Sequence, residues 1–186
     1  ISISGVTFIG ILNGISLSLL SNICYHEFNG FAICPGLFFS PETSGISIGG
    51  IINVIHQIKG VQLSIGYNGN EYASGVSGSL LWNSSLYGSG LAFGGIINRA
   101  IVRESSSWKG VSFGGAANIV DEHSGLQMGL FNYSKRLKGV QLGLINYADN
   151  GILPIMPILN FNFSSEENAE ETIEESISYA ASNARG

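Results

Sequence analysis

Apolar and polar residues alternate one by one along several stretches of this chain. The segment 61–68 shows the pattern best, because its odd positions are apolar and its even positions are small or polar. Strict alternation over eight residues predicts a β-strand, since successive side chains of an extended backbone point to opposite faces. Segments 126–130 and 140–144 alternate in the same way, and no helical period is found in residues 1–163.

A nine-residue phrase carries this alternation and recurs about every fifteen residues. It reads Gly, apolar, small or polar, apolar, Gly or Ser, two mostly apolar positions, one variable position and Asn. Clear copies occupy 45–53, 90–98 and 110–118, and a partial copy occupies 5–13. A fixed period predicts a repeat architecture with one structural unit per copy. The leading glycines are Gly14, Gly30, Gly45, Gly60, Gly75, Gly90, Gly110, Gly125, Gly139 and Gly151.

The stretches between the phrases are expected to be turns. They are rich in Asn, Asp, Gly and Ser, which adopt positive φ or bond the local backbone. Examples are 69–71, 83–85, 120–123, 133–136 and 148–151, and the one longer loop is Ile101–Lys109. Each unit would then hold about ten residues of strand and about five of turn.

Two architectures fit such a unit. The preferred one is all-β, an antiparallel meander of about ten strands closed into a barrel-like sheet, which removes the exposed sheet edges. The alternative is a β-solenoid with about fifteen residues per coil, in which identical positions stack. Strand length and scarcity of charge favour the barrel. Regular spacing, even linker lengths and an Asn at a fixed place favour the solenoid.

The end of the chain departs from the repeat, and we expect two domains. Residues 1–163 form the repeat β domain, whose last unit, 151–163, differs from the others as a cap would. Residues 164–186 form an acidic tail, rich in Glu, Ala and Ser. A four-residue apolar spacing would give this tail a narrow stripe if it were a helix. The alternative is a solvated segment.

Composition limits the partners and the cysteine chemistry that can be expected. Gly contributes 26 of 186 residues, and charged residues only 11%. Residues 1–163 hold seven acidic and seven basic residues, so nothing predicts a nucleic-acid partner. Cys24 and Cys34 lie ten residues apart, which fits either a small-loop disulfide of an exported protein or two free thiols.

No catalytic signature accompanies the repeat. His26, His56 and His123 lie in or beside the expected turns, without metal-ligand spacing. Asp121 and Glu122 precede His123 and could be sketched as a cation site, but an exposed polar turn is the preferred interpretation. No nucleophile elbow or phosphate-binding loop occurs in its proper context. We therefore predict a protein that is not an enzyme, with no catalytic, cofactor-binding or metal-binding residues and no cofactor.

Two late copies, Gly125–Asn132 and Gly139–Asn146, read Gly-Leu-Gln-Met-Gly-Leu-Phe-Asn and Gly-Val-Gln-Leu-Gly-Leu-Ile-Asn. Followed by Leu-Pro-Ile-Met-Pro-Ile-Leu-Asn-Phe at 153–161, they resemble a family of bacterial surface-repeat proteins. That family is built from Gly-Leu-Gln-x-Gly-Leu-x-Asn units and a Leu-Pro-x-x-Pro-x-x-Asn-Phe closing segment. The resemblance is specific over 110–163 and looser over 5–98. It implies a surface location and no particular activity.

The function expected from these features is that of a non-enzymatic cell-surface or outer-membrane β-repeat protein, exported from the cytoplasm. Membrane lipid would meet the apolar strand face, and aromatic residues near the strand ends would form its girdles. The alternative is a soluble, surface-tethered binding or structural module, either a solenoid or a small closed sheet. Its linkers would then meet a protein partner, and its apolar faces would pack inward.

Overall fold

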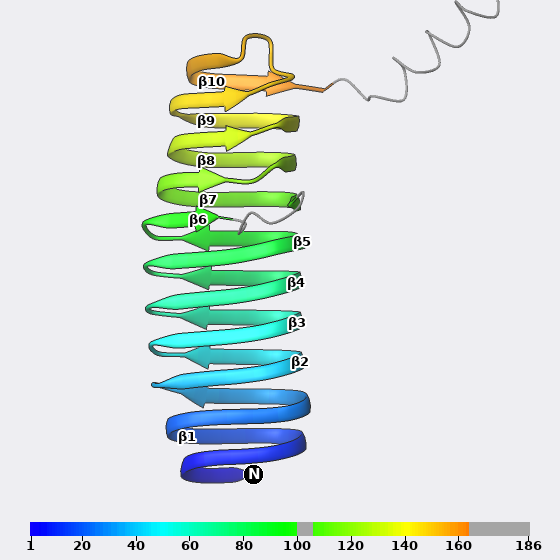
Figure 1. The fold of residues 1–186 in the computed structure, drawn as a ribbon, viewed down its shortest axis with the longest axis vertical. Coiled ribbons are helices and arrows are strands. Elements are labelled where there is room, and N and C mark those ends of the chain that lie inside the picture. The colour runs from blue at the N-terminus through cyan, green and yellow to red at the C-terminus, as the bar shows by residue number, and fades with distance from the viewer. Residues whose placement is uncertain (100–105, 164–186) are drawn as a thin grey trace, which may run out of the picture.

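The computed structural model describes residues 1–99 and 106–163, which form one ten-stranded sheet wound into a column (Figure 1). The strands follow one another in sequence order across the sheet. Their bounds are β1 Ser2–Cys34, β2 Leu37–Gly49, β3 Ile52–Ser64, β4 Tyr67–Ser79, β5 Trp82–Gly94, β6 Ile97–Arg99, β7 Ser107–Ile119, β8 Glu122–Ser134, β9 Arg136–Ala148 and β10 Ile155–Asn162.

Neighbouring coils run parallel, so the preferred prediction of a closed antiparallel barrel is wrong and the solenoid alternative is confirmed. Gly45 of β2 pairs with Gly60 of β3, and Gly60 with Gly75 of β4, one period apart. Every pairing from β1 to β9 is parallel. The chain rises by one strand spacing per coil, which brings each repeat position onto its equivalent and satisfies every copy in the same way.

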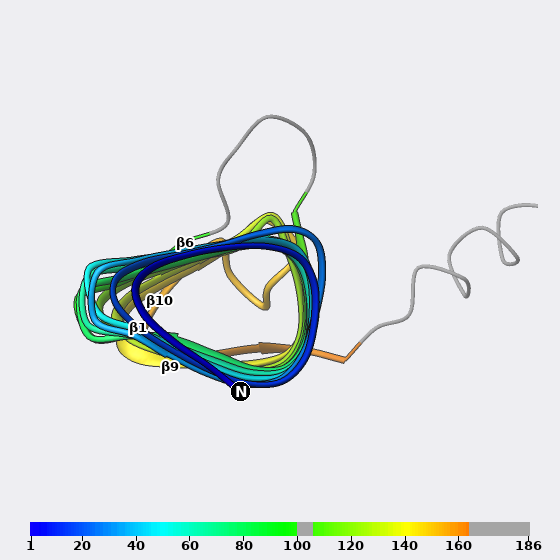
Figure 2. The same cartoon turned by 90° about the horizontal axis from the view of Figure 1, so that it is seen from below.

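Each coil has a three-cornered cross-section, seen along the column in Figure 2. One corner lies inside the nine-residue phrase, where strand pairing stops at residues 50–51, 65–66, 80–81 and 95–96. The second lies where the β2–β3 register omits Pro41 and His56. The third lies at the leading glycine. The predicted turns at 69–71 and 83–85 are strand residues instead. Gly69, Asn70 and residues 83–85 are buried, so their polar composition belongs to the hydrogen-bonded interior of the column and not to a chain reversal.

The leading glycines form the tightest column of the structure. Nine of them, from Gly14 to Gly139, have φ between 112° and 141°, a region that residues with a Cβ rarely adopt. At Gly75, an added Cβ would also overlap the carbonyl oxygen of Gly60 in the coil below. The same overlap recurs from Gly30 onward, whereas Gly14 has open space beneath it. The invariant glycine therefore serves both the corner and the close stacking of coils.

The small, polar face of the alternation lines the interior, and the apolar face is outside. Ser47, Asn53 and Gln62 are fully buried, whereas Ile51 and Ile65 remain more than 60% exposed. The two sets do point in opposite directions, as the alternation predicts. The inward apolar packing expected of a soluble module is wrong. The alternating positions that point into the coil are mostly small or polar, and the large apolar side chains that do lie inside, such as Ile55 and Ile58, form a separate buried cluster.

Buried amides hold that interior together. In several coils the Asn that closes the phrase bonds the Ser six residues before it, as in Asn53 to Ser47 at 2.8 Å and Asn22 to Ser16 at 2.7 Å. Successive Asn residues also bond along the column, and Asn132 donates to Asn146 at 2.8 Å. Burial of polar groups is favoured by hydrogen bonding, and the stack supplies acceptors for these amide N–H groups, although Oδ1 of Asn53 and of Asn132 has no partner within the described part of the chain.

The first coils depart from this amide column. Phe38 stands where the neighbouring coils carry Asn22 and Asn53. It packs edge-on against Phe28 at 5.8 Å between ring centroids, within an apolar cluster that includes Ile55 and Ile58. The partial copy at 5–13 is also out of register. Asn13 accepts a bond from Asn29, next to Gly30, and does not stack beneath Asn22.

Repeat units that are longer or shorter than fifteen residues change the strand pairing only near the extra or missing residues. The twenty-residue spacing between Gly90 and Gly110 leaves their pairing intact, and β5 pairs with both β6 and β7. The predicted long loop is partly wrong, because Ser107–Lys109 belong to β7, while 100–105 lie outside the described residues. The fourteen-residue unit loses one residue at the bend, where the β7–β8 register shifts between Gly114 and Ala117.

The C-terminal unit ends the stack by reversing direction. After a turn at 149–150, β10 pairs antiparallel with β9 and lies at the edge of the sheet (Figure 1). Fully buried Asn160 pairs with Gln141 there. The predicted acidic tail, 164–186, lies outside the described residues.

Both cysteines are free and buried. Cys24 Sγ donates to the carbonyl of Glu27 at 3.1 Å, and Cys34 Sγ donates to that of Leu37 at 3.2 Å. The sequence left open either a disulfide or two free thiols, and the structure has two free thiols.

Candidate functional site

The three corners divide the surface of the column into three sides. The first apolar side follows each leading glycine, the second apolar side follows the bend within the phrase, and the charged side precedes the next glycine. From the third coil onward the first apolar side comprises 46–49, 61–64, 76–79, 91–94, 111–114, 126–129 and 140–143. The second comprises 52–55, 67–70, 82–85, 97–99, 117–120, 131–134 and 145–148. The charged side comprises 56–59, 71–74, 86–89, 106–109, 121–124, 135–138 and 149–150, with 25–29 and 41–44 before them.

Charge is confined almost entirely to one side. Within 1–99 and 106–163, only Arg99 carries a charge away from the charged side. That side holds six acidic and five basic residues, namely Glu27, Glu42, Lys59, Glu71, Lys109, Asp121, Glu122, Lys135, Arg136, Lys138 and Asp149. The column is therefore amphipathic along its whole length, with two apolar sides and one charged side.

The two apolar sides meet at the bend in a ridge, which we term the apolar corner. Its residues are among the most exposed large hydrophobic side chains, with exposures between 49% and 72%. They are Leu19, Leu20, Ile51, Ile65, Leu80, Leu81, Ile96, Leu130 and Leu144. Single exposed hydrophobic residues are ordinary, but a continuous patch over many coils marks an interaction surface.

Side chains on the charged side pair between neighbouring coils. His56 Nδ1 lies 2.8 Å from Glu71 Oε2, Lys135 Nζ lies 3.1 Å from Asp121 Oδ1, and Arg136 pairs with Glu122. Tyr133 and Tyr147 stack nearby at 5.1 Å. Exposed ion pairs contribute little to stability. These pairs connect neighbouring coils across the charged side.

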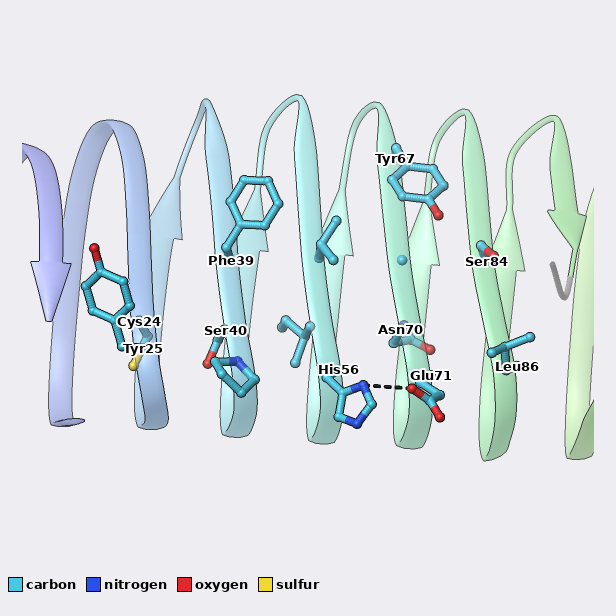
Figure 3. A pocket seen from close by; sticks show the side chains of 14 residues that line it. Cys24, Tyr25, Phe39, Ser40, His56, Tyr67, Asn70, Glu71, Ser84 and Leu86 are labelled. Carbon is cyan, nitrogen blue, oxygen red and sulfur yellow. Dashed lines mark ion pairs between the residues drawn. The ribbon is translucent and has the colours of Figure 1, made fainter. Parts of the chain in front are cut away.

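A groove of about 550 Å³ lies where the second apolar side meets the charged side (Figure 3). Val54, Tyr67 and Leu86 form part of its wall, and His56 and Glu71 pair at its rim. Gly69 lines the groove without a side chain, and the ring of Tyr67 covers it. The chemistry of the groove suits an apolar group.

The groove does not assemble a catalytic constellation. The hydroxyl of Ser40 donates to the Glu42 carbonyl at 2.7 Å, and the thiol of Cys24 is engaged with the Glu27 carbonyl. These two side chains are thus held by the backbone and not by His56. A nucleophile needs a base within hydrogen-bond reach, so this geometry does not favour covalent chemistry.

Asp121, Glu122 and His123 diverge, so the cation site sketched from the sequence does not form. The preferred reading of an exposed turn is also wrong for two of them, because Asp121 and His123 are buried. Burial would raise the pKa of the Asp121 carboxyl, but hydrogen bonds from Ser106 and the ammonium of Lys135 outweigh it and lower that pKa. Glu122 pairs outward with Arg136.

His123 lies inside the column with 2% of its surface exposed. Neither ring nitrogen has a partner at normal hydrogen-bond geometry within the described part of the chain. Burial lowers the pKa of His123 to about 4, and the backbone of Leu126 offsets this only partly. The ring is neutral at pH 7, stacked in register between Trp108 and Leu137. It is a packing residue under strain and not a ligand.

No cluster of three or more His, Cys, Asp or Glu side chains suited to a metal ion occurs among residues 1–99 and 106–163. Over the same ranges, no helix has the length and hydropathy needed to cross a membrane.

The sequence analysis placed an outward apolar face only on a membrane barrel and packed the apolar faces of the alternative module inward, so it missed the two outward apolar sides of a solenoid. One signal for them is that charge in residues 1–163, apart from Arg99, falls between the third residue after the closing Asn position and the next leading Gly. A side that carries nearly all the charge must face water, and the alternating apolar positions belong to the other two sides. Comparison with known proteins adds no template, because no family model, no curated protein and no solved structure matches this chain.

Proposed function

We propose that this chain is a non-enzymatic structural and binding module, a rigid β-solenoid that docks its two apolar sides onto another surface. The single observation that carries the proposal is the segregation of charge onto one side of the column. This folded chain buries polar amides and leaves many large apolar side chains in contact with water. Contact with a partner surface would remove that apolar surface from water, which is favourable.

A cell-surface location forms part of this proposal. It is supported by the resemblance of the 125–146 repeats and the 153–161 closing segment to bacterial surface-repeat proteins. Membership of that family stays a prediction, since no family model matches. The outward apolar sides also favour contact with membrane lipid as a second candidate. The charged side opposes a fully lipid-surrounded column, because it runs from Glu27 to Asp149.

The proposal is tested by polarising the apolar corner. In the triple variant Ile65→Ser, Leu80→Ser and Leu144→Ser, exposed side chains are replaced without touching the buried amides. We expect an unchanged thermal midpoint by circular dichroism, together with loss of the associated state seen for the wild type by sedimentation. The matched control is the triple variant Ser44→Ala, Ser74→Ala and Ser89→Ala on the charged side. It should change neither the thermal midpoint nor the associated state. A wild type that stays a dispersed monomer with nothing bound, whether alone, with vesicles or with detergent, would sink the proposal.

A further inference from the structure

We infer that the partner of the first apolar side is a second copy of this chain, which packs its own first apolar side against it. The inference rests on the proposed function, because it names which surface the docking side meets. Three properties of that side support it, namely its area, its lack of charge and its regular relief.

The area is sufficient for a stable pair. Nine coils are marked by the glycines from Gly14 to Gly139. At about 4.8 Å between strands they extend for about 40 Å, and a side of four residues is about 13 Å wide. The first apolar side therefore offers about 520 Å², and two copies would bury about 1,040 Å², which reaches the roughly 1,000 Å² that a specific interface needs.

The first apolar side is also the better docking surface of the two. Within the described ranges it carries no charged residue, whereas the second apolar side carries Arg99. Charged residues are depleted from the cores of interfaces because their desolvation is costly. An uncharged side can be buried without that cost.

The relief of this side repeats in register and suits an identical surface. Leu91 of one coil and Val111 and Phe113 of the next project with 38–42% of their surfaces exposed. Rows at strand spacing interdigitate with equal rows, as facing sheets do at about 10 Å. A hollow of about 360 Å³ beside Gly49 and Gly50 leaves room for a protruding side chain.

Lipid fits the same surface less well. Segments that lie in a membrane interface usually carry Lys and Arg on the polar face, where they meet anionic headgroups. Here the charged side holds six acidic and five basic residues in the described ranges, so its electrostatics give no attraction to such a membrane. A second copy buries the first apolar side and leaves both charged sides in water.

The test is the mass of the full chain in detergent-free buffer, measured by sedimentation equilibrium over a hundredfold concentration range. We expect twice the chain mass of 19.7 kDa for the wild type. Phe113→Glu should shift the dimer dissociation constant upward by at least about a hundredfold, since it buries an unpaired charge. Phe131→Glu is the matched control on the second apolar side, with 38% exposure against 42% for Phe113, and should leave the dimer intact.

Phe113→Ser, which adds no charge, should weaken the pair less and keeps the test valid if the Glu variant misfolds. Flotation with phosphatidylcholine vesicles, with and without an anionic lipid, separates the outcomes. A wild type that is monomeric in buffer but floats with vesicles would overturn the second-copy inference and leave the proposed docking function standing. A wild type that is monomeric in buffer and floats with neither kind of vesicle would overturn both the second-copy inference and the proposed docking function. A dimer broken by Phe131→Glu and not by Phe113→Glu would overturn the assignment of the side.

Discussion

The side-chain amide of Asn83 donates a 2.9 Å hydrogen bond to Oδ1 of Asn98, which lies one coil further along the column. Asn98 in turn donates to Asn118 at 3.2 Å and to Ser112 at 2.8 Å. The closing Asn of each repeat is therefore a link between coils, and its fixed place in the phrase follows from that contact.

Removing one amide from this column should be costly. We expect Asn98→Ala to lower the free energy of unfolding by about 2–3 kcal/mol, because it leaves the Asn83 donor unpaired in the interior and opens a small cavity. Asn29→Ala is the control, since Asn29 bonds Asn13 near the surface and should cost less than about 1 kcal/mol. Urea unfolding followed by circular dichroism measures both. Equal losses would show that the buried column has no special role.

The stacked glycines allow backbone strain and steric overlap to be separated. Gly75→Ala combines an unfavourable φ with overlap onto Gly60, and we expect a loss of about 3 kcal/mol or more. Gly14→Ala has the same φ but open space, and should cost about 1–2 kcal/mol. Gly5→Ala has neither and should stay within about 0.5 kcal/mol of the wild type. Thermal midpoints of the three variants test the order, and a Gly14 variant as unstable as the Gly75 variant would contradict the stacking argument.

Acid should weaken the fold through His123. Its pKa is about 4 when folded and near 6.5 when unfolded, so the unfolded state holds more protons between these values. The unfolding free energy should therefore fall by up to about 3 kcal/mol as the pH drops from 7 to 4. The Asp121 carboxyl, whose pKa is lowered, loses its stabilising contribution only at still lower pH.

The variant His123→Leu isolates this effect, because Leu137 occupies the equivalent position in the next coil. We expect a flatter dependence of stability on pH between 7 and 4 in this variant. His26→Gln removes an exposed imidazole and should retain the wild-type profile. Parallel profiles for the wild type and His123→Leu would show that the buried ring does not control acid sensitivity.

The two thiols should be present but slow to react. Cys24 and Cys34 are buried and hydrogen-bonded to carbonyls, and burial raises the pKa of the Cys34 thiol, which lowers its thiolate fraction at neutral pH. An aromatic disulfide reagent should label neither within minutes in native buffer and both after denaturation without reductant. Absence of free thiols in the denatured, unreduced protein would demonstrate a disulfide and contradict the structure.

Much of the fold follows from local pattern. Alternation predicts the extended segment at 61–64, although the same pattern continues through the corner at 65–66, and the recurring glycine and asparagine determine the unit and its length. The departure at 151–163 marks the last unit, which β10 forms by pairing antiparallel with β9. These features can be predicted from the sequence because each depends on residues within one repeat.

Only the tertiary structure decided that the coils run parallel and that Gln62 points inward while Leu63 points outward. Alternation is symmetric, so it separates two faces without saying which one is enclosed. The closure of the coil decided the choice, because the alternating positions that point inward are mostly Ser, Asn and Gln joined by hydrogen bonds, while an apolar cluster that includes Phe38 and Ile55 fills part of the interior. The docking surface follows from that direction, which alternation by itself does not give.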